Sequence, residues 1–164
     1  MVATKTVGKL HLDVTGDREI RMTREFDAPR QMLWDCHTKP DLVRKWMLGP
    51  PGWTMPVCDI DLRVGGRYRY VWAKDGAEMG MGGVFREVDA PANLASREIF
   101  DEDWTGGETI TTQAFEETAK DKTLLTTTIV YGSREGRDRA LATPMMDGME
   151  AGYSRLDETF AEQR

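Results

Sequence analysis

The sequence predicts an α+β domain in which a curved antiparallel sheet of about seven strands wraps around one long C-terminal helix. Residues 55–132 consist almost entirely of short segments with alternating apolar and polar residues, separated by turn signals such as Asp75-Gly76. Residues 145–160 instead repeat apolar residues at helical spacing. Because a lone amphipathic helix must bury its apolar face against another layer, we expect it to pack on the sheet.

The segment before this sheet predicts one strand and two short helices. Residues 1–16 are polar and mixed, which is typical of a flexible or weakly ordered arm or of a weak first strand. Residues 18–26 alternate like a half-buried strand, and Asp27-Ala28-Pro29 then favours a helix over residues 29–37. A second short helix is expected over residues 38–47. All 164 residues are expected to form a single domain.

Six further strands follow, and the short connections between them indicate an antiparallel meander. They are expected at residues 55–62, 67–74, 79–88, 94–100, 108–116 and 123–131. A short helix is expected next over residues 134–141, and Thr143-Pro144 predicts a break before the long helix.

The long helix has a loose apolar face. Met149, Gly152 and Leu156 are among the residues predicted to face the sheet, whereas Glu150 is predicted to face water. Methionine adapts to irregular shapes, and glycines at positions 148 and 152 would leave a shallow notch in the helix surface. These features favour a pocket between helix and sheet, although the notch could equally be packed against backbone.

Composition restricts the class of protein. The 22 basic and 28 acidic residues give a net charge of −6, and no basic patch with interleaved aromatic residues indicates nucleic-acid binding. No apolar run is long enough to span a bilayer, and the first residues lack the apolar core of a signal peptide. A cytoplasmic protein without membrane insertion is therefore expected. The two cysteines predict reduced thiols, and they and the two histidines lack metal-ligand spacing, so neither a metal site nor a cofactor is expected.

A series of short motifs runs in order through nearly the whole chain. It comprises Arg24-Glu25-Phe26-Asp27-Ala28-Pro29, Leu33-Trp34, Pro40-Asp41-Leu42, Lys45-Trp46, Gly49-Pro50-Pro51-Gly52-Trp53, Asp61-Leu62-Arg63-Val64-Gly65-Gly66, Asp75-Gly76, residues 83–88 and residues 148–156. In this order the chain resembles the SRPBCC (START-like) helix-grip superfamily and, within it, the bacterial homologues of the activator of the heat-shock-protein-90 ATPase. The resemblance implies a helix-grip fold with a lipophilic cavity. It implies no single ligand or reaction, because such folds host unrelated activities.

The residues predicted to contact a ligand are large or adaptable apolar side chains, with one glycine, placed to face the gap between helix and sheet. They are Trp46, Trp53, Tyr68, Tyr70, Trp72, Met79, Met81, Phe85, Met145, Met149, Gly152 and Tyr153. A plain core rich in aromatic residues and methionine accounts for the same pattern. Arg24 and Glu98 are the charged residues expected near the interior, and an inward Arg24 needs a carboxylate partner, from the protein or from a ligand.

Three functions fit these observations. The first is binding of a small hydrophobic or aromatic molecule by a carrier, sensor or stress-related protein. The second is an enzyme of the polyketide cyclase or hydrolase kind, for which Tyr68, Tyr70 and Thr112 are the available polar groups, but no catalytic motif is recognised. The third is a chaperone-interacting protein, although no second domain is expected that could clamp a chaperone. A homodimer is compatible with the sequence.

Overall fold

The structure, a computed structural model, describes residues 4–163, and within this range the chain forms nine strands and four helices. The strands are β1 (Thr4–Val7), β2 (Leu10–Thr15), β3 (Glu19–Phe26), β4 (Thr54–Ile60), β5 (Arg67–Lys74), β6 (Ala77–Asp89), β7 (Asn93–Phe100), β8 (Thr109–Ala119) and β9 (Lys122–Val130). The helices are α1 (Arg30–Thr38), α2 (Pro40–Trp46), α3 (Arg134–Leu141) and α4 (Met145–Glu162). The predicted α+β class is confirmed, and the predicted break before α4 separates it from α3.

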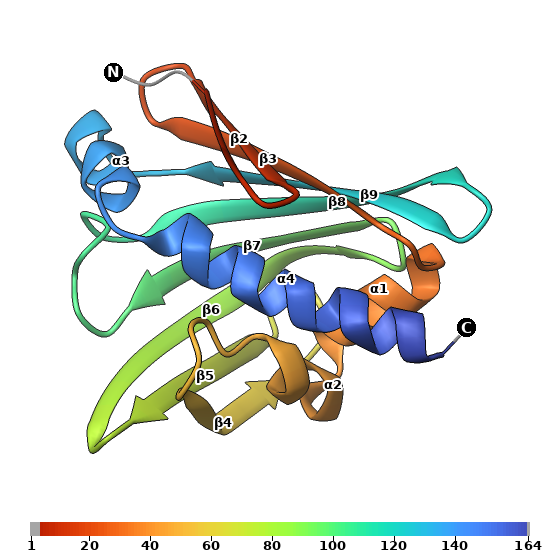
Figure 1. Ribbon diagram of the computed structural model, residues 1–164. Coiled ribbons are helices and arrows are strands. Elements are labelled where there is room, and N and C mark those ends of the chain that lie inside the picture. Colours follow the sequence, from red (N-terminus) through yellow and green to blue (C-terminus); the bar gives the residue numbers. More distant parts are fainter. Residues whose placement is uncertain (1–3, 164) are drawn as a thin grey trace.

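All of these strands pair antiparallel in one sheet, in the order β1-β2-β3-β9-β8-β7-β6-β5-β4. Strands β4 to β9 form the predicted meander, and β3 joins it by pairing with β9. The sheet curls around α4, so that β2, β3 and β9 lie on one side of the helix and β4 to β6 on the other (Figure 1). The long helix therefore lies across the concave face, which is the helix-grip arrangement.

Two alternatives were predicted for residues 1–16, a flexible or weakly ordered arm and a weak strand, and residues 4–7 and 10–15 form strands. Residues 1–3 lie outside the described range, but β1 and β2 form a hairpin, and β2 pairs with β3. Leu10 and Leu12 on β2 are both buried. The sheet thus has two strands more than predicted. A short polar segment gives little strand signal of its own, because its order comes from pairing with a neighbour that the sequence does not identify.

Helix α4 buries Gly152 and Leu156 as predicted, but Glu150 takes the inward position that was predicted for Met149. Its buried residues are Met146, Glu150, Gly152, Tyr153, Leu156 and Phe160, whereas Met149 is only half-buried. The prediction that Glu150 faces water is wrong. Glu150 is inward because Arg24 on β3 lies beneath this part of α4 and pairs with its carboxylate.

Arg24 forms the carboxylate pairing that its inward position required. Its guanidinium donates to Glu150 from Nε at 2.7 Å and from Nη2 at 3.0 Å, and to Asp157 from Nη1 at 3.0 Å and Nη2 at 2.9 Å. The backbone N–H of Lys9, at the tip of the β1–β2 hairpin, donates to Glu150 at 3.1 Å. Burial alone would lower the pKa of Arg24, but these hydrogen bonds raise it above its ordinary value. We call Arg24, Glu150 and Asp157 the ion cluster.

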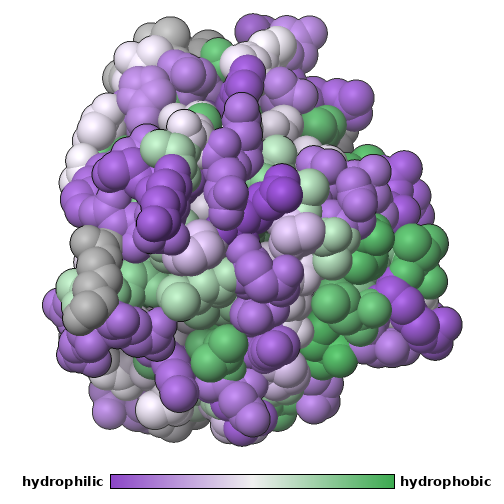
Figure 2. All heavy atoms as spheres, turned by 90° about the vertical axis from the view of Figure 1, so that its right-hand side faces the viewer, coloured by the Kyte–Doolittle hydropathy of each residue, from purple (hydrophilic) through white to green (hydrophobic). Residues whose placement is uncertain are grey.

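The surface at the end of the molecule where α4 terminates is mainly hydrophilic, and its largest hydrophobic patch lies toward one edge of that view (Figure 2). Leu62, Val64, Met79 and Ile99 are the large apolar side chains that the described residues leave exposed. None of the helices in residues 4–163 is both long enough and apolar enough to cross a membrane.

Candidate functional site

The interior beneath α4 contains two aromatic groups. The first lies where α4 meets α2, and we call it the closed contact: Trp46, Gly152 and Tyr153. The rings of Trp46 and Tyr153 stack with centroids 5.4 Å apart, and the Trp46 indole donates to the carbonyl of Cys36 at 2.7 Å. A Cβ atom added to Gly152 would lie 2.8 Å from the Trp46 carbonyl oxygen. The helix is therefore packed against backbone at Gly152, and the predicted notch is filled there.

His37 of α1 completes this aromatic packing. Its ring lies 4.8 Å from Trp46 and 5.2 Å from Phe115, measured between ring centroids. Nδ1 donates to the carbonyl of Leu33 at 2.8 Å, whereas Nε2 has no hydrogen-bond partner among the described residues. Burial lowers the pKa of His37 to about 4, so the imidazole is neutral at pH 7.

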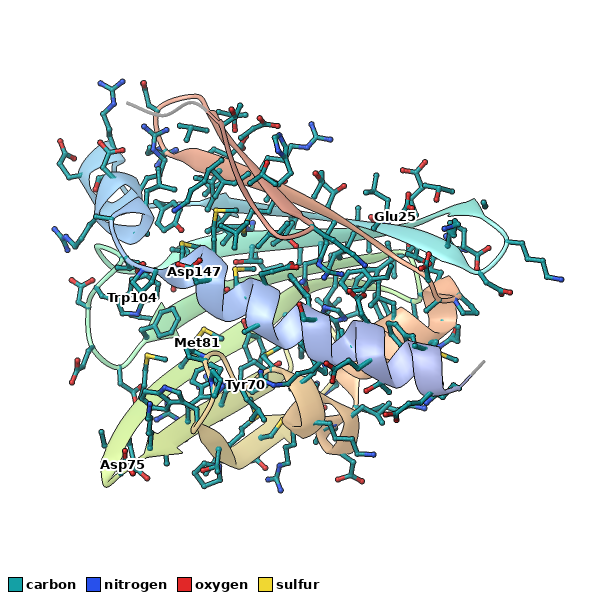
Figure 3. The ribbon with its side chains drawn as sticks, viewed as in Figure 1. Glu25, Tyr70, Asp75, Met81, Trp104 and Asp147 are labelled. Carbon is teal, nitrogen blue, oxygen red and sulfur yellow. The ribbon has the colours of Figure 1, made fainter. Side chains whose placement is uncertain are left out.

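The second aromatic group lies on the concave face of the sheet. Alternation along β5 points Tyr68, Tyr70 and Trp72 inward, and Met81 and Phe85 on β6 join them. The ring centroids of Tyr68 and Phe85 are 5.0 Å apart, and those of Tyr68 and Tyr70 are 5.1 Å apart. Tyr70, Met81 and Trp104 lie on the α4 side of the lower strands, far from the hairpin tip at Asp75 (Figure 3).

A group of polar side chains adjoins these rings, and we call Tyr68, Ser96, Glu98 and Thr111 the polar cluster. The Glu98 carboxylate accepts hydrogen bonds from the Tyr68 hydroxyl at 2.6 Å and from the Thr111 hydroxyl at 2.7 Å. The Tyr68 hydroxyl also lies 3.0 Å from Ser96 Oγ. Because a phenol carries one proton, Tyr68 donates it to the carboxylate, and Ser96 can donate to the phenol oxygen.

The hydrogen bond between Tyr68 and Glu98 is possible because residue 83 is a glycine. In the register of the sheet, Gly83 on β6 lies directly between Tyr68 on β5 and Glu98 on β7. A Cβ atom at Gly83 would overlap the Tyr68 ring. The missing side chain lets the phenol lie across β6 and reach the carboxylate two strands away.

The tyrosines around Glu98 stay protonated at neutral pH. Burial, with the charge of Glu98 as the second cause, raises the pKa of Tyr68, Tyr70 and Tyr131. Their hydroxyl groups therefore keep their protons, and the Tyr68 hydroxyl donates to the Glu98 carboxylate.

The structure places most, but not all, of the predicted ligand residues in this interior. Trp53, Met145 and Met149 are partly buried and pack against the core, whereas Met79, predicted to face the gap, is 39% exposed near the β5–β6 turn. The role of the buried residues in binding stays a prediction.

The sequence did not identify Ser96 and Thr111. Thr112 was the threonine considered, but it is exposed, because β8 turns the odd-numbered threonines inward. Alternation along β8 from the buried Phe115 would have selected Thr111.

Two pockets lie at the surface. One, of about 390 Å³, lies over the outer side of β5 to β7, with Arg67, Arg69, Gly82 and Arg97 among its lining residues. The other, of about 230 Å³, is bordered by Lys9, Asp157 and Phe160. A cavity between α4 and the sheet remains a prediction. Residues 4–163 contain no group of three or more His, Cys, Asp or Glu side chains suited to a metal ion.

A long helix held across a curved antiparallel sheet, with aromatic and polar side chains between them, defines the helix-grip class of protein. A family model described as "Activator of Hsp90 ATPase homolog 1-like protein" matches residues 27–161. The chain belongs to this family, and the resemblance inferred from its motifs is confirmed.

Solved structures with the same fold support this placement. A protein from Rhodobacter sphaeroides is 29% identical with a TM-score of 0.88, and the alignment covers 94% of this chain and 99% of that one. A protein from Mycobacterium smegmatis is 24% identical with a TM-score of 0.75, covering 87% and 90% of the two chains. An HSP90 activator from Plasmodium falciparum is 17% identical with a TM-score of 0.61, covering 88% and 96%. The last two show the fold alone. A comparison with curated proteins found no match.

Proposed function

We propose that this protein binds a small apolar or aromatic molecule between α4 and the concave face of the sheet, as a cytoplasmic carrier or sensor. The observation that supports this most directly is the polar cluster, a hydrogen-bonded carboxylate set among aromatic rings. Binding sites for small molecules combine mostly apolar walls with a few placed polar groups. Tyr70, Trp72, Met81 and Phe85 would supply the walls.

The proposal is tested by titrating the protein with the neutral fluorescent probe N-phenylnaphthylamine and following probe and tryptophan emission. We expect saturable binding. Two methionines on β6 provide a matched pair, because Met81 is 7% exposed and Met79 is 39% exposed. Met81→Ala should change the affinity for the probe, and Met79→Ala should leave it unaltered. Thermal melts confirm that both variants fold, and absence of saturable binding to the wild-type protein would exclude the proposal.

Catalysis at the same place, of the polyketide cyclase or hydrolase kind, is a second candidate function. It is favoured by the 2.6 Å hydrogen bond between Tyr68 and Glu98, which joins a donor and a carboxylate inside the fold. Its test is product formation from an aromatic polyketide substrate by the wild-type protein, with loss of turnover in Glu98→Gln. Equal turnover by both proteins would exclude this role of Glu98.

Interaction with a chaperone is the third candidate, favoured by the description of the family and by the structural likeness to the Plasmodium falciparum HSP90 activator. The measurement is the ATPase rate of an Hsp90 chaperone with and without this protein. An unchanged ATPase rate at saturating protein would exclude this candidate and would not affect the proposal of small-molecule binding.

A further inference from the structure

Among residues 4–163, Glu98 differs from the other inward charged side chains in having no counter-ion. Arg24, Arg137 and Glu150 are the buried charged residues, and each has a partner of opposite charge. Glu98 is half-buried and forms no ion pair within the part of the chain that the structure describes. Its neighbour Arg97 points to the outer face, where Nε lies 3.2 Å from Glu108. An inward carboxylate without a cation is costly, so its position needs a reason.

The hydrogen bonds that Glu98 accepts leave some acceptor positions of its carboxylate unused. Each carboxylate oxygen accepts one hydrogen bond, Oε2 from Tyr68 and Oε1 from Thr111. An ionised carboxylate has about four acceptor positions, so roughly two remain. The two hydroxyl groups fix its orientation and add no positive charge. A positively charged group that also donates hydrogen bonds is the partner that this carboxylate lacks.

The surroundings of Glu98 suit an organic cation rather than a metal ion. The rings of Tyr68, Tyr70 and Phe85 form a continuous aromatic group beside it. Aromatic faces attract ammonium and guanidinium groups, and they provide contact area for an apolar body. Metal ions would instead require several carboxylate, imidazole or thiolate ligands, and only one carboxylate is present in the polar cluster.

A buried hydrogen-bond donor without a partner among the described residues lies on the same side of the sheet. Trp104 packs on Phe100 with ring centroids 4.7 Å apart, and Phe100 follows Glu98 by two residues on β7, so both point to the concave face. The indole Nε1 of Trp104 is buried and has no hydrogen-bond partner among residues 4–163. This end of the interior thus holds both an acceptor and a donor that the protein itself does not fully use.

From these contacts we infer that the ligand is an organic cation, an amine or ammonium with an aromatic or apolar body, whose charged group is held by Glu98. The inference rests on the proposed binding function and names the ligand class for the same site. Glu98 then serves as the specificity determinant, and Tyr68 and Thr111 are positioning residues that aim its carboxylate.

Three naphthalene probes of nearly equal shape test this: cationic naphthylmethylammonium, neutral naphthalenemethanol and anionic naphthoate, each titrated at low salt and followed by tryptophan fluorescence. We expect the wild-type protein to bind the cation at least about tenfold more tightly than the alcohol, and the anion most weakly. Glu98→Gln keeps the shape but removes the charge, and should bring the cation and the alcohol to within about twofold of each other. Glu87→Gln, on the exposed part of β6, should keep the wild-type preference.

The outcomes separate the inference from the proposed function. Equal binding of cation and alcohol by the wild-type protein, or a preference for naphthoate, would overturn the ligand class while small-molecule binding stood. A cation preference that survived in a folded Glu98→Gln variant would overturn the role of Glu98. If neither these probes nor N-phenylnaphthylamine bound, the proposed function would fail and the inference with it. The comparison of the three probes on the wild-type protein requires no variant. It would still test the ligand class if Glu98→Gln folded poorly.

Discussion

Glu150 and Glu98 both point into the interior of this protein, but they are held in opposite ways. Glu150 of α4 lies against Arg24 with two hydrogen bonds of 2.7 and 3.0 Å, and the β1–β2 hairpin covers it. Glu98 of β7 is held by two hydroxyl groups and by no cation among the described residues. One carboxylate therefore has its charge balanced inside the fold, and the other does not.

This difference separates a structural region from a candidate binding region. The ion cluster and the closed contact tie α4 to β3, α2 and the N-terminal hairpin through salt bridges, stacked rings and a close approach to backbone. The polar cluster instead lies on β5, β7 and β8 beside the aromatic rings of Tyr70 and Phe85. Replacing residues in the first region should cost stability, whereas replacing those in the second should change binding.

The largest effect is expected in the ion cluster. Glu150→Gln should lower the free energy of unfolding by about 3 to 5 kcal/mol, nearer the lower limit because Asp157 still pairs with Arg24. The loss arises because a buried guanidinium would keep only part of its balancing charge. Urea unfolding measures it, with Glu158→Gln on the exposed face of α4 as the control that should be silent. Equal stability of the two variants would show that the ion cluster does not hold the fold.

Local patterns were sufficient to predict much of the fold. Strand β5 was predicted with its observed bounds because Tyr68, Tyr70 and Trp72 recur at every second residue. The boundaries of α3 and the start of α4 followed equally well, since helix breakers surround them. The boundaries of such elements are determined by their own residues and not by the elements that pack against them.

What could not be predicted depends on partners that are distant in the chain. The inward position of Glu150 is set by Arg24, which lies 126 residues away. Hydropathy alone assigns a glutamate to solvent, and the predicted position of Glu150 was accordingly wrong. The contact of Gly152 with Trp46 and the grouping of Ser96, Glu98 and Thr111 arise in the same way, from the register of elements that no single segment encodes.

A smaller effect is expected from His37 beside the closed contact, and it depends on pH. The pKa of His37 is lowered to about 4 in the folded protein, below its ordinary value of 6.5. Between these values the unfolded chain binds more protons, so stability should fall as the pH decreases, by up to about 3 kcal/mol. His37→Phe should lack this contribution. The measurement is the difference in unfolding free energy between wild type and variant at neutral and acidic pH; a constant difference would contradict the burial of a neutral imidazole.

Two glycines on α4 test whether the closed contact is really closed. A Cβ atom at Gly152 would meet the Trp46 carbonyl oxygen at 2.8 Å, whereas one at Gly148 would have only an ordinary contact of 3.5 Å with Pro50. Gly152→Ala should therefore lower the free energy of unfolding by about 1 to 2 kcal/mol through overpacking. Gly148→Ala should raise it by up to about 1 kcal/mol, because alanine favours the helix. Thermal denaturation shows whether each substitution lowers or raises stability. If both variants were more stable than the wild type, α4 would not be packed against α2 at Gly152.

The smallest change in stability is expected at Glu98, and it makes the comparison with Glu150 quantitative. Glu98→Gln keeps the acceptor oxygen for one hydroxyl group and removes a charge that has no counter-ion in the described structure. The lost hydrogen-bond strength and the relieved cost of the charge oppose each other, so the free energy of unfolding should change by less than about 1 kcal/mol. The same urea series used for Glu150→Gln measures it. If Glu98→Gln instead cost as much as Glu150→Gln, the carboxylate would be a structural element of the sheet, and the inference that it serves a cationic ligand would lose its basis.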